Sequence, residues 1–367
     1  TMFVGSVKEI KNQEYRVGLI PAHIKSFVDS GHTVFIEKDA GLGSGFTNED
    51  YAFYGAIVLD TAEEVWNKVD LLIKVKEPLE SEYRYFREDL ILFTYLHLAA
   101  DEALTKALIE SKMSALAYET LDVNGSLPLL KPMSEIAGRL SIQEAAKYLE
   151  KPFGGKGLLL SGLPGVMKAK VMIIGAGVAG KNAAKIAIGM GADVYVLDRN
   201  INRLEQLENE FGFQVKTRYS TPATIGELLP MMDVVVGAVL VPGAKAPKLI
   251  MREDLKKMQA GSVIVDIAVD QGGCFETTRP TTHLDPIYNV DGIIHYCVAN
   301  MPGSVPMTST LGLNNATLEY SLLLANYGLK GAIIKNAHLL SAINTYQGRL
   351  TNAAVAEAFN LKFEAFI

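Results

Sequence analysis

Three glycines and one aspartate carry the clearest chemical signal in this chain. Gly175, Gly177 and Gly180 have the spacing G-x-G-x-x-G, and Asp198 ends the next apolar run. In this pattern the first glycine permits a tight turn, the second lets the backbone approach a pyrophosphate, and the third lets a helix pack closely on a strand. The aspartate accepts hydrogen bonds from ribose hydroxyls and repels a 2′-phosphate, which favours NAD over NADP. Arg199 follows directly and can weaken that preference.

The residues around these glycines predict the elements that must position them. Residues 170–174 form a β-branched apolar run typical of a buried strand, residues 182–189 have helical spacing, and residues 192–197 form a second apolar run. The start of the predicted helix offers free N–H groups to phosphates. This context favours a dinucleotide site over the alternative, a glycine-rich turn that binds nothing.

Three further side chains have types that suit catalysis or the binding of a carboxylate. His97 follows a predicted buried strand and is either a general acid or base or a packed histidine. Lys76 ends another strand and can hold a carboxylate or lie in solvent, while Lys74 competes for that role. Arg16 can clamp a carboxylate with paired hydrogen bonds, although by itself it is more simply explained as a solvated loop arginine.

Two aspartates frame the stretch VDIAVDQGG at the end of another predicted strand. Asp270 precedes a Gly-Gly turn and suits a carboxylate aimed into a cleft, whereas the alternative is that Asp270 or Asp266 only caps a turn. Cys274 has no neighbouring base in the sequence and is interpreted as a small buried thiol. No Cys/His cluster has metal-ligand spacing, so we expect no metal.

Composition limits the class of protein. The chain has 367 residues, 49% of them hydrophobic, and a formal net charge of −6, which indicates a globular protein long enough for two domains. Without a basic cluster, nucleic acid and anionic membranes are poor partners. Cys274 and Cys297 build no disulfide framework, and the start of the chain lacks the apolar core of a signal peptide. We therefore expect a cytoplasmic protein without a membrane span.

Alternating strand and helix patterns predict an α/β fold of two Rossmann-like doubly wound domains, the second inserted into the first. The expected bounds are 1–128 with 304–367 for a substrate domain and 129–303 for an NAD-binding domain. A helix beginning near Ser134 leads from one domain into the other. The C-terminal region is expected to return to the first domain without a sheet of its own, as helices over residues 314–327, 331–343 and 352–359.

Along essentially its whole length the sequence resembles bacterial alanine dehydrogenase. The matching stretches are KEIKNQEYRVGLIP, KVKEP, LFTYLHLAA, LPLLKPMSEIAGR, IIGAGVAG, VLVPGAKAPKL, DIAVDQGGCFE and YCVANMPGSVP. The resemblance implies reversible NAD-dependent oxidative deamination of L-alanine to pyruvate and ammonium. It also implies a homo-oligomer, typically a hexamer in this family.

The resemblance assigns roles residue by residue. It implies that Arg16 and Lys76 bind the substrate and that His97 and Asp270 are catalytic. The residues that it implies for contact with NAD are Ser134, Gly175, Gly177, Val178, Ala179, Gly180, Asp198, Arg203, Ser220, Val239, Leu240, Ile267, Asp270, Arg279, Val298 and Met301.

One departure and three alternatives accompany the resemblance. Some relatives hold magnesium through an acid and a histidine in the helix after SVPMTST, where this chain has Leu323 and Tyr327, so we expect no such metal. A first alternative is the NAD-binding component of a proton-translocating transhydrogenase, which needs no amino-acid site. A second is a non-catalytic NAD-sensing module, and a third is a related enzyme for a larger amino acid. The joint presence of the four implied substrate and catalytic residues favours alanine dehydrogenase.

Overall fold

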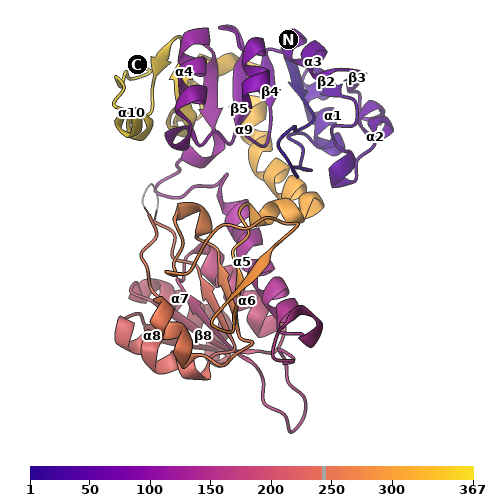
Figure 1. The fold of residues 1–367 in the computed structure, drawn as a ribbon. Coiled ribbons are helices and arrows are strands. Elements are labelled where there is room, and N and C mark those ends of the chain that lie inside the picture. The colour runs from indigo at the N-terminus through magenta and orange to yellow at the C-terminus, as the bar shows by residue number, and fades with distance from the viewer. Residues whose placement is uncertain (242–244) are drawn as a thin grey trace. The chain divides into compact units, whose positions relative to one another are not determined.

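The computed structural model describes residues 1–241 and 245–367, and it divides into two compact units (Figure 1). Unit 1 comprises Thr1–Met133 and Val305–Ile367, and unit 2 comprises Ser134–Ser304. Each unit has its own mostly parallel sheet with helices, which confirms the predicted fold class of two Rossmann-like domains. Residues 242–244, within the stretch VLVPGAKAPKL, lie outside the described residues.

Unit 1 is built on an eight-stranded sheet in the order β15-β14-β6-β5-β4-β1-β2-β3. The first six strands in sequence pair in parallel, as expected when helices connect them. The strands are β1 (Phe3–Ser6), β2 (Thr33–Glu37), β3 (Ile57–Leu59), β4 (Leu71–Ile73), β5 (Ile91–Thr94), β6 (Ser114–Ala117), β14 (Ile343–Tyr346) and β15 (Arg349–Leu350). The helices are α1 (Pro21–Asp29), α2 (Asn48–Phe53), α3 (Ala62–Lys68), α4 (Glu102–Ser111), α9 (Pro306–Lys335) and α10 (Ala353–Phe359).

The C-terminal region differs from its prediction. The helix expected over residues 331–343 ends at Lys335, and β14 and β15 then join the sheet of unit 1 as antiparallel strands. Gln347 and Gly348 connect these two strands, both with positive φ, which is the backbone of a tight two-residue hairpin. Within α9, Gly328 has φ 68° and interrupts the helix close to the predicted break. The prediction of helix as far as residue 343 was therefore wrong, and the two strands were missed because their pairing depends on β6, which is distant in the sequence.

Unit 2 is built on a seven-stranded sheet in the order β12-β13-β11-β10-β7-β8-β9. Its strands are β7 (Lys170–Ile174), β8 (Asp193–Asp198), β9 (Val215–Tyr219), β10 (Val234–Gly237), β11 (Val263–Asp266), β12 (Ile287–Val290) and β13 (Ile293–Tyr296). Its helices are α5, α6 (Val178–Gly189), α7 (Ile201–Phe211) and α8 (Pro222–Leu228). The sequence analysis did not predict β12, an antiparallel edge strand that lacks a buried pattern. The helix α5 (Lys131–Tyr148) begins three residues before the predicted start.

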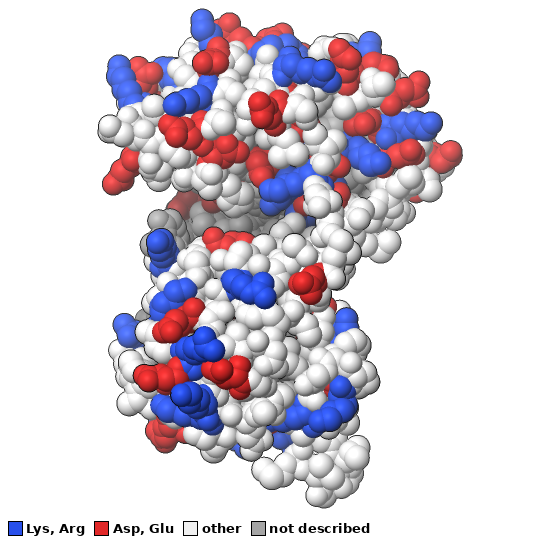
Figure 2. Space-filling model, in the orientation of Figure 1, with Lys and Arg blue, Asp and Glu red and all other residues white. Residues whose placement is uncertain are grey.

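A separate apolar core stabilises each unit. The core of unit 1 includes Trp66, Leu72 and Leu92, and that of unit 2 includes Met172 and Val235, all fully buried. Removing one such side chain from water stabilises the fold by about 1.5–3 kcal/mol. On the visible face of each unit, cationic and anionic side chains are interspersed rather than segregated (Figure 2). Among the described residues, no helix has the length and apolar character needed to cross a membrane.

Candidate functional site

The strands of unit 2 end in register at one edge of their sheet. Ile174 of β7 pairs with Leu197 of β8 and with Gly237 of β10, and Gly237 pairs with Asp266 of β11. Segments that follow these strands therefore start at the carboxyl edge, where ligands bind in open α/β sheets. Asp198 is the last residue of β8, and the predicted dinucleotide contacts that follow a strand of this sheet are Gly175, Gly177, Val178, Ala179, Gly180, Ser220, Val239, Leu240, Ile267, Asp270, Val298 and Met301.

Two of the three glycines are required by the fold itself. Gly175 has φ +110°, and a Cβ there would lie 2.6 Å from the carbonyl oxygen of Ala238. A Cβ on Gly180 would lie 1.7 Å from the carbonyl oxygen of Gly175. Helix α6 can therefore approach β7 this closely only because position 180 has no side chain.

Gly177 has a different surrounding. A Cβ added to Gly177 would have Nη1 of Arg203, at 3.8 Å, as its nearest described neighbour, so the space beside this residue is open. Gly177 is the N-cap of α6 and has no side chain to bond the free N–H groups of the first turn. Open space beside unpaired N–H groups at a helix start fits the binding of a phosphate.

Asp198 lies beside the same turn. Its Oδ2 accepts a hydrogen bond from the N–H of Ala176 at 2.7 Å, and its Oδ1 accepts one from the N–H of Asn200 at 2.7 Å. Nη1 of Arg203 lies 3.9 Å from Oδ2, and the Arg203 side chain is about half exposed. The carboxylate is thus fixed in position by backbone groups while each oxygen keeps a further lone pair for a ribose hydroxyl.

The helix α5 packs against this turn. A Cβ on Gly138 would lie 2.1 Å from the carbonyl oxygen of Ala179, so the two helices touch through their backbones. Ser134 lies one helical turn earlier than Gly138 on the same face of α5. The guanidinium of Arg279 lies over the ring of Tyr288, 4.0 Å from the ring centroid.

The structure separates the roles of the two aspartates that the sequence left open. Asp266 is fully buried and accepts hydrogen bonds from the N–H groups of Ala268 at 3.0 Å and Cys274 at 2.8 Å, and from the hydroxyl of Thr278. Burial raises the pKa of Asp266, and these hydrogen bonds partly oppose that shift. Asp270 is exposed on the short 3-10 turn Val269–Gln271. Asp266 therefore stabilises the loop through hydrogen bonds, whereas the carboxylate of Asp270 is accessible to solvent.

In unit 1, His97 and Lys76 follow the neighbouring strands β5 and β4. His97 is exposed and has φ 48°, a left-handed conformation that is uncommon for a residue other than glycine. Its N–H donates to Oε1 of Glu119 at 2.9 Å, and the N–H of Leu96 donates to the same carboxylate. The imidazole ring stacks on Tyr95 with 6.3 Å between ring centroids. Glu119, which the sequence analysis missed, thus holds the backbone that carries His97.

The competition between the two lysines is resolved by burial. Lys74 is fully buried in an ion pair with Glu9 and lies 3.8 Å from a carboxylate oxygen of Glu82, and these two acids raise the pKa of Lys74 although burial opposes them. Lys76 is half-buried, and its N–H donates to Oε1 of Glu9 at 2.8 Å. Burial lowers the pKa of Lys76, and Glu77 partly opposes that shift. Lys76 is therefore the lysine available to a ligand.

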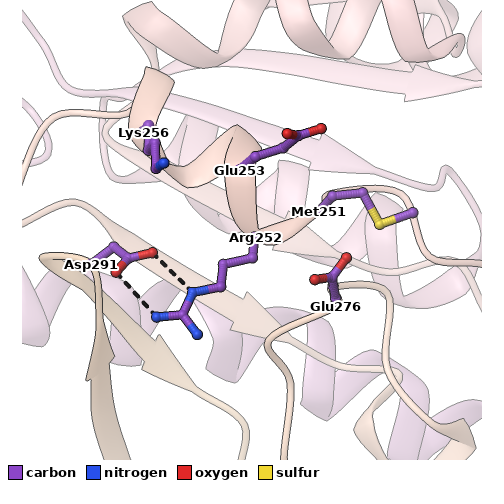
Figure 3. Close-up of a pocket in the computed structure, with 6 residues that line it drawn as sticks. All are labelled: Met251, Arg252, Glu253, Lys256, Glu276 and Asp291. Atoms are coloured by element: carbon purple, nitrogen blue, oxygen red, sulfur yellow. Dashed lines mark hydrogen bonds and ion pairs between the residues drawn. The ribbon is translucent and has the colours of Figure 1, made fainter.

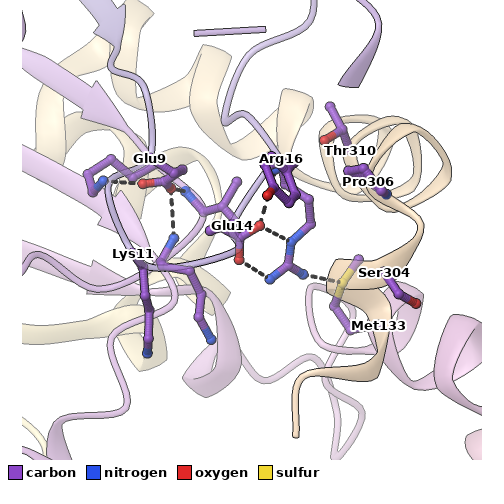
Figure 4. Close-up of polar contacts among 12 residues, drawn as sticks. Glu9, Lys11, Glu14, Arg16, Met133, Ser304, Pro306 and Thr310 are labelled. Carbon is purple, nitrogen blue, oxygen red and sulfur yellow. Dashed lines mark hydrogen bonds and ion pairs between the residues drawn. The ribbon is translucent and has the colours of Figure 1, made fainter. Parts of the chain in front are cut away.

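Arg16 lies in the loop between β1 and α1 and is buried rather than solvated, contrary to the simplest interpretation of the sequence. Glu14 accepts hydrogen bonds from Arg16 through Nε at 2.8 Å and through Nη2 at 2.5 Å (Figure 4). Arg16 and Glu14 both interact electrostatically with Lys76, and Arg16 also interacts electrostatically with Tyr95. Arg16 is thus linked to Lys76 and, by way of Tyr95, to His97, and these side-chain types suit binding and proton transfer on a small carboxylic acid.

A separate pocket lies on unit 2 (Figure 3). Arg252 and Asp291 form a paired hydrogen-bonded contact at 3.2 and 3.3 Å in its wall. Arg252 precedes β11 and Asp291 precedes β13, so the pocket is near the amino ends of these strands. It therefore lies away from the carboxyl edge that carries the glycine turn. The residues that line it are Met251, Arg252, Glu253, Lys256, Glu276 and Asp291.

The fold and the glycine turn place the chain in the class of two-domain, dinucleotide-dependent α/β proteins. Models of the alanine dehydrogenase/PNT N-terminal and C-terminal domains match residues 5–137 and 141–353. The chain belongs to the alanine dehydrogenase/PNT family.

Individual relatives agree with this assignment. Alanine dehydrogenase 2 of Staphylococcus aureus (strain USA300) is 56% identical over 366 residues, which cover 99% of this chain and 98% of that protein. The solved structure of an L-alanine dehydrogenase is 50% identical, with a TM-score of 0.95 and coverage of 98% of this chain and 99% of that one. The crystal structure of a transhydrogenase from Sinorhizobium meliloti shares the fold at 24% identity, with a TM-score of 0.83 and coverage of 96% and 99%.

Proposed function

We propose that this protein is an NAD-dependent alanine dehydrogenase, an oxidoreductase that converts L-alanine, NAD and water reversibly into pyruvate, ammonium and NADH. The observation that supports the proposal is the polar set of unit 1, in which Arg16 interacts electrostatically with Lys76 and with Tyr95, whose ring stacks on His97. An amino-acid substrate needs such a set, whereas a transhydrogenase component or a sensing module does not. The whole-length likeness to alanine dehydrogenases supports the same assignment.

The residues of unit 2 fit NAD. Gly177 leaves room for a pyrophosphate at the start of α6, and Asp198 suits a ribose diol. The other contacts implied by the family resemblance are Ser134, Gly175, Val178, Ala179, Gly180, Arg203, Ser220, Val239, Leu240, Ile267, Asp270, Arg279, Val298 and Met301. When bound, NAD supplies the acceptor for a hydride from the substrate.

In unit 1, the chain's own residues would bind and orient the amino acid. Arg16 and Lys76 hold its carboxylate and so fix the position of Cα. Loss of a hydride from Cα leaves an imine, and addition of water gives a carbinolamine that collapses to pyruvate and ammonium. His97 and Asp270 would carry the protons of these steps, since an imidazole and a carboxylate are both common general acids and bases in enzymes.

We also propose a homo-oligomer, a hexamer by resemblance to the family, that works in the cytoplasm. Large apolar side chains on the segment before β7 support association, since Leu163 is 62% and Met167 is 73% exposed. Cys274 and Cys297 are both free thiols, as expected in a reducing compartment. Light scattering after size-exclusion chromatography measures the subunit number directly.

The test of function follows NADH absorbance with pyruvate and enzyme, with and without ammonium. Loss of NADH that requires ammonium is the expected result, and His97→Ala should abolish it. His338→Ala, which alters a histidine of the 3-10 turn Ala337–Ala342, is the matched control and should leave the rate unchanged. Loss without ammonium would indicate a keto-acid reductase. Bound NADH without turnover in either mixture would favour the transhydrogenase-like or sensing alternative.

A further inference from the structure

The loop between β1 and α1 buries an ion pair between neighbours in the sequence. The side chains of Arg16 and Glu14 are 2% and 1% exposed. Glu14 accepts from Nε and Nη2 of Arg16 and also from the backbone N–H of Arg16, at 3.1 Å. The two bonds from the guanidinium to one carboxylate leave it little freedom to rotate, so Glu14 fixes its plane (Figure 4).

The backbone of the loop brings this pair together. Gln13 has φ 60°, and the N–H of Glu14 donates to the carbonyl oxygen of Lys11 at 3.1 Å, which turns the chain just before Glu14. Beyond Arg16, the N–H of Val17 donates to the hydroxyl of Thr310 on α9 at 3.2 Å. The loop is thus tied to α9 after Arg16, while Glu14 holds the arginine side chain from the turn before it.

The charge of Glu14 is adapted to this task. Burial by itself would raise the pKa of Glu14, but the hydrogen bonds and the charge of Arg16 outweigh burial and hold that pKa below its ordinary value. Glu14 is therefore ionised at neutral pH, and it compensates a cation that burial would otherwise destabilise. Its position, two residues from Arg16, keeps this compensation inside a single loop.

A further donor of the guanidinium lies beside Met133. Nη1 of Arg16 donates to Sδ of Met133 at 3.2 Å. A thioether sulfur is a weak acceptor, whereas the carboxylate of a substrate is a strong one. A substrate carboxylate that replaces this thioether contact would therefore form the stronger hydrogen bond with Nη1.

We infer that Glu14 is a positioning residue for Arg16. It fixes the plane of the guanidinium so that the Nη1 side is presented to the carboxylate of the substrate. The inference rests on the proposed function, because it takes Arg16 to be the substrate-binding arginine. Glu14 itself touches no substrate in this arrangement and acts only through Arg16.

The test measures the KM values for pyruvate and NADH in Glu14→Gln, Glu14→Asp and the wild type. The amide of Gln accepts from one donor of Arg16 but repels the other, and the shorter Asp cannot bridge Nε and Nη2. Both variants should raise the KM for pyruvate by about tenfold, since a hydrogen bond to a charged group contributes roughly that much. The KM for NADH should change less than about twofold, because NADH does not meet Arg16 in this arrangement.

Two further variants separate positioning from a structural effect. In an Arg16→Lys background, Glu14→Gln should add less than about twofold to the KM for pyruvate, because the guanidinium that Glu14 orients is gone. Glu227→Gln removes the acid of the exposed pair between Arg218 and Glu227 on unit 2 and should change neither KM. If Glu14→Gln does not fold, Glu14→Asp, which keeps the charge, carries the measurement.

An unchanged KM for pyruvate in a folded Glu14 variant would overturn the inference. So would an equal effect of Glu14→Gln with and without Arg16. If the wild type shows no ammonium-dependent turnover, the proposed function itself fails and the inference fails with it, which is a different result from an active wild type with an insensitive Glu14.

Discussion

Substitution by alanine should affect stability at Gly180 and cofactor binding at Gly177. A Cβ on Gly180 would lie 1.7 Å from the carbonyl oxygen of Gly175, more than an ångström inside the 3.0 Å that real Cβ atoms keep. Gly175 is itself held in place, because its N–H donates to the carbonyl oxygen of Leu197 at 2.8 Å. Overpacking of this kind costs about 1–3 kcal/mol or more, against about 1 kcal/mol gained from alanine in a helix. Gly180→Ala should therefore lower the melting temperature by several degrees.

Gly177→Ala should leave the fold intact and weaken cofactor binding. Gly177 has φ −72° and ψ −164°, which any L-residue adopts, and its nearest described neighbour is Nη1 of Arg203 at 3.8 Å. The change in unfolding free energy should stay within about 1 kcal/mol. The new methyl group stands where the pyrophosphate would approach α6, so the Kd for NADH should rise at least about tenfold, or 1.4 kcal/mol.

Thermal unfolding and titration of NADH fluorescence measure the two effects separately. Gly189→Ala is the matched control, because it lies at the other end of α6 and a Cβ there meets no described atom within 4 Å. It should leave the NADH affinity unchanged and should not lower the melting temperature, since alanine is favoured over glycine in a helix. Normal NADH affinity in Gly177→Ala, or wild-type stability in Gly180→Ala, would refute the assignment of the two glycines.

Three further predictions concern pH, thiol reactivity and the backbone at the histidine. Burial lowers the pKa of Lys76 below its ordinary 10.5. The KM for pyruvate should therefore be constant near neutral pH and rise before pH 10.5, as the side chain of Lys76 loses its charge. The KM of Lys76→Arg should stay constant over the same range, and a constant KM in the wild type would contradict this reasoning. Burial raises the pKa of Cys274 and of Cys297 to about 12. An aromatic disulfide reagent at pH 8 should therefore label neither thiol in the folded protein and both thiols after denaturation. Rapid labelling of the native protein would contradict this prediction. Glu119→Gln should lower kcat by about tenfold through the left-handed backbone at His97, without changing NADH affinity, and an unaltered kcat would show that this carboxylate is dispensable.

The sequence predicted what depends on neighbours along the chain. The buried runs around Gly175 predicted strands β7 and β8, and the spacing of three glycines predicted the turn and helix between them. These features follow from local sterics, since a turn with φ +110° and a helix in backbone contact with a strand both require the absence of a side chain. The roles of the implied substrate and cofactor residues remain predictions, which the experiments above address.

Tertiary structure decided whatever depends on residues distant in the sequence. Strands β14 and β15 exist because β6, more than two hundred residues earlier, offers an edge to pair with. Lys74 is buried and Lys76 is available because Glu9, from the loop after β1, pairs with one and holds the backbone of the other. The two lysines are the same residue type, two positions apart in the sequence. Only solvation and the nearby counter-charge distinguish them, and the folded chain sets both.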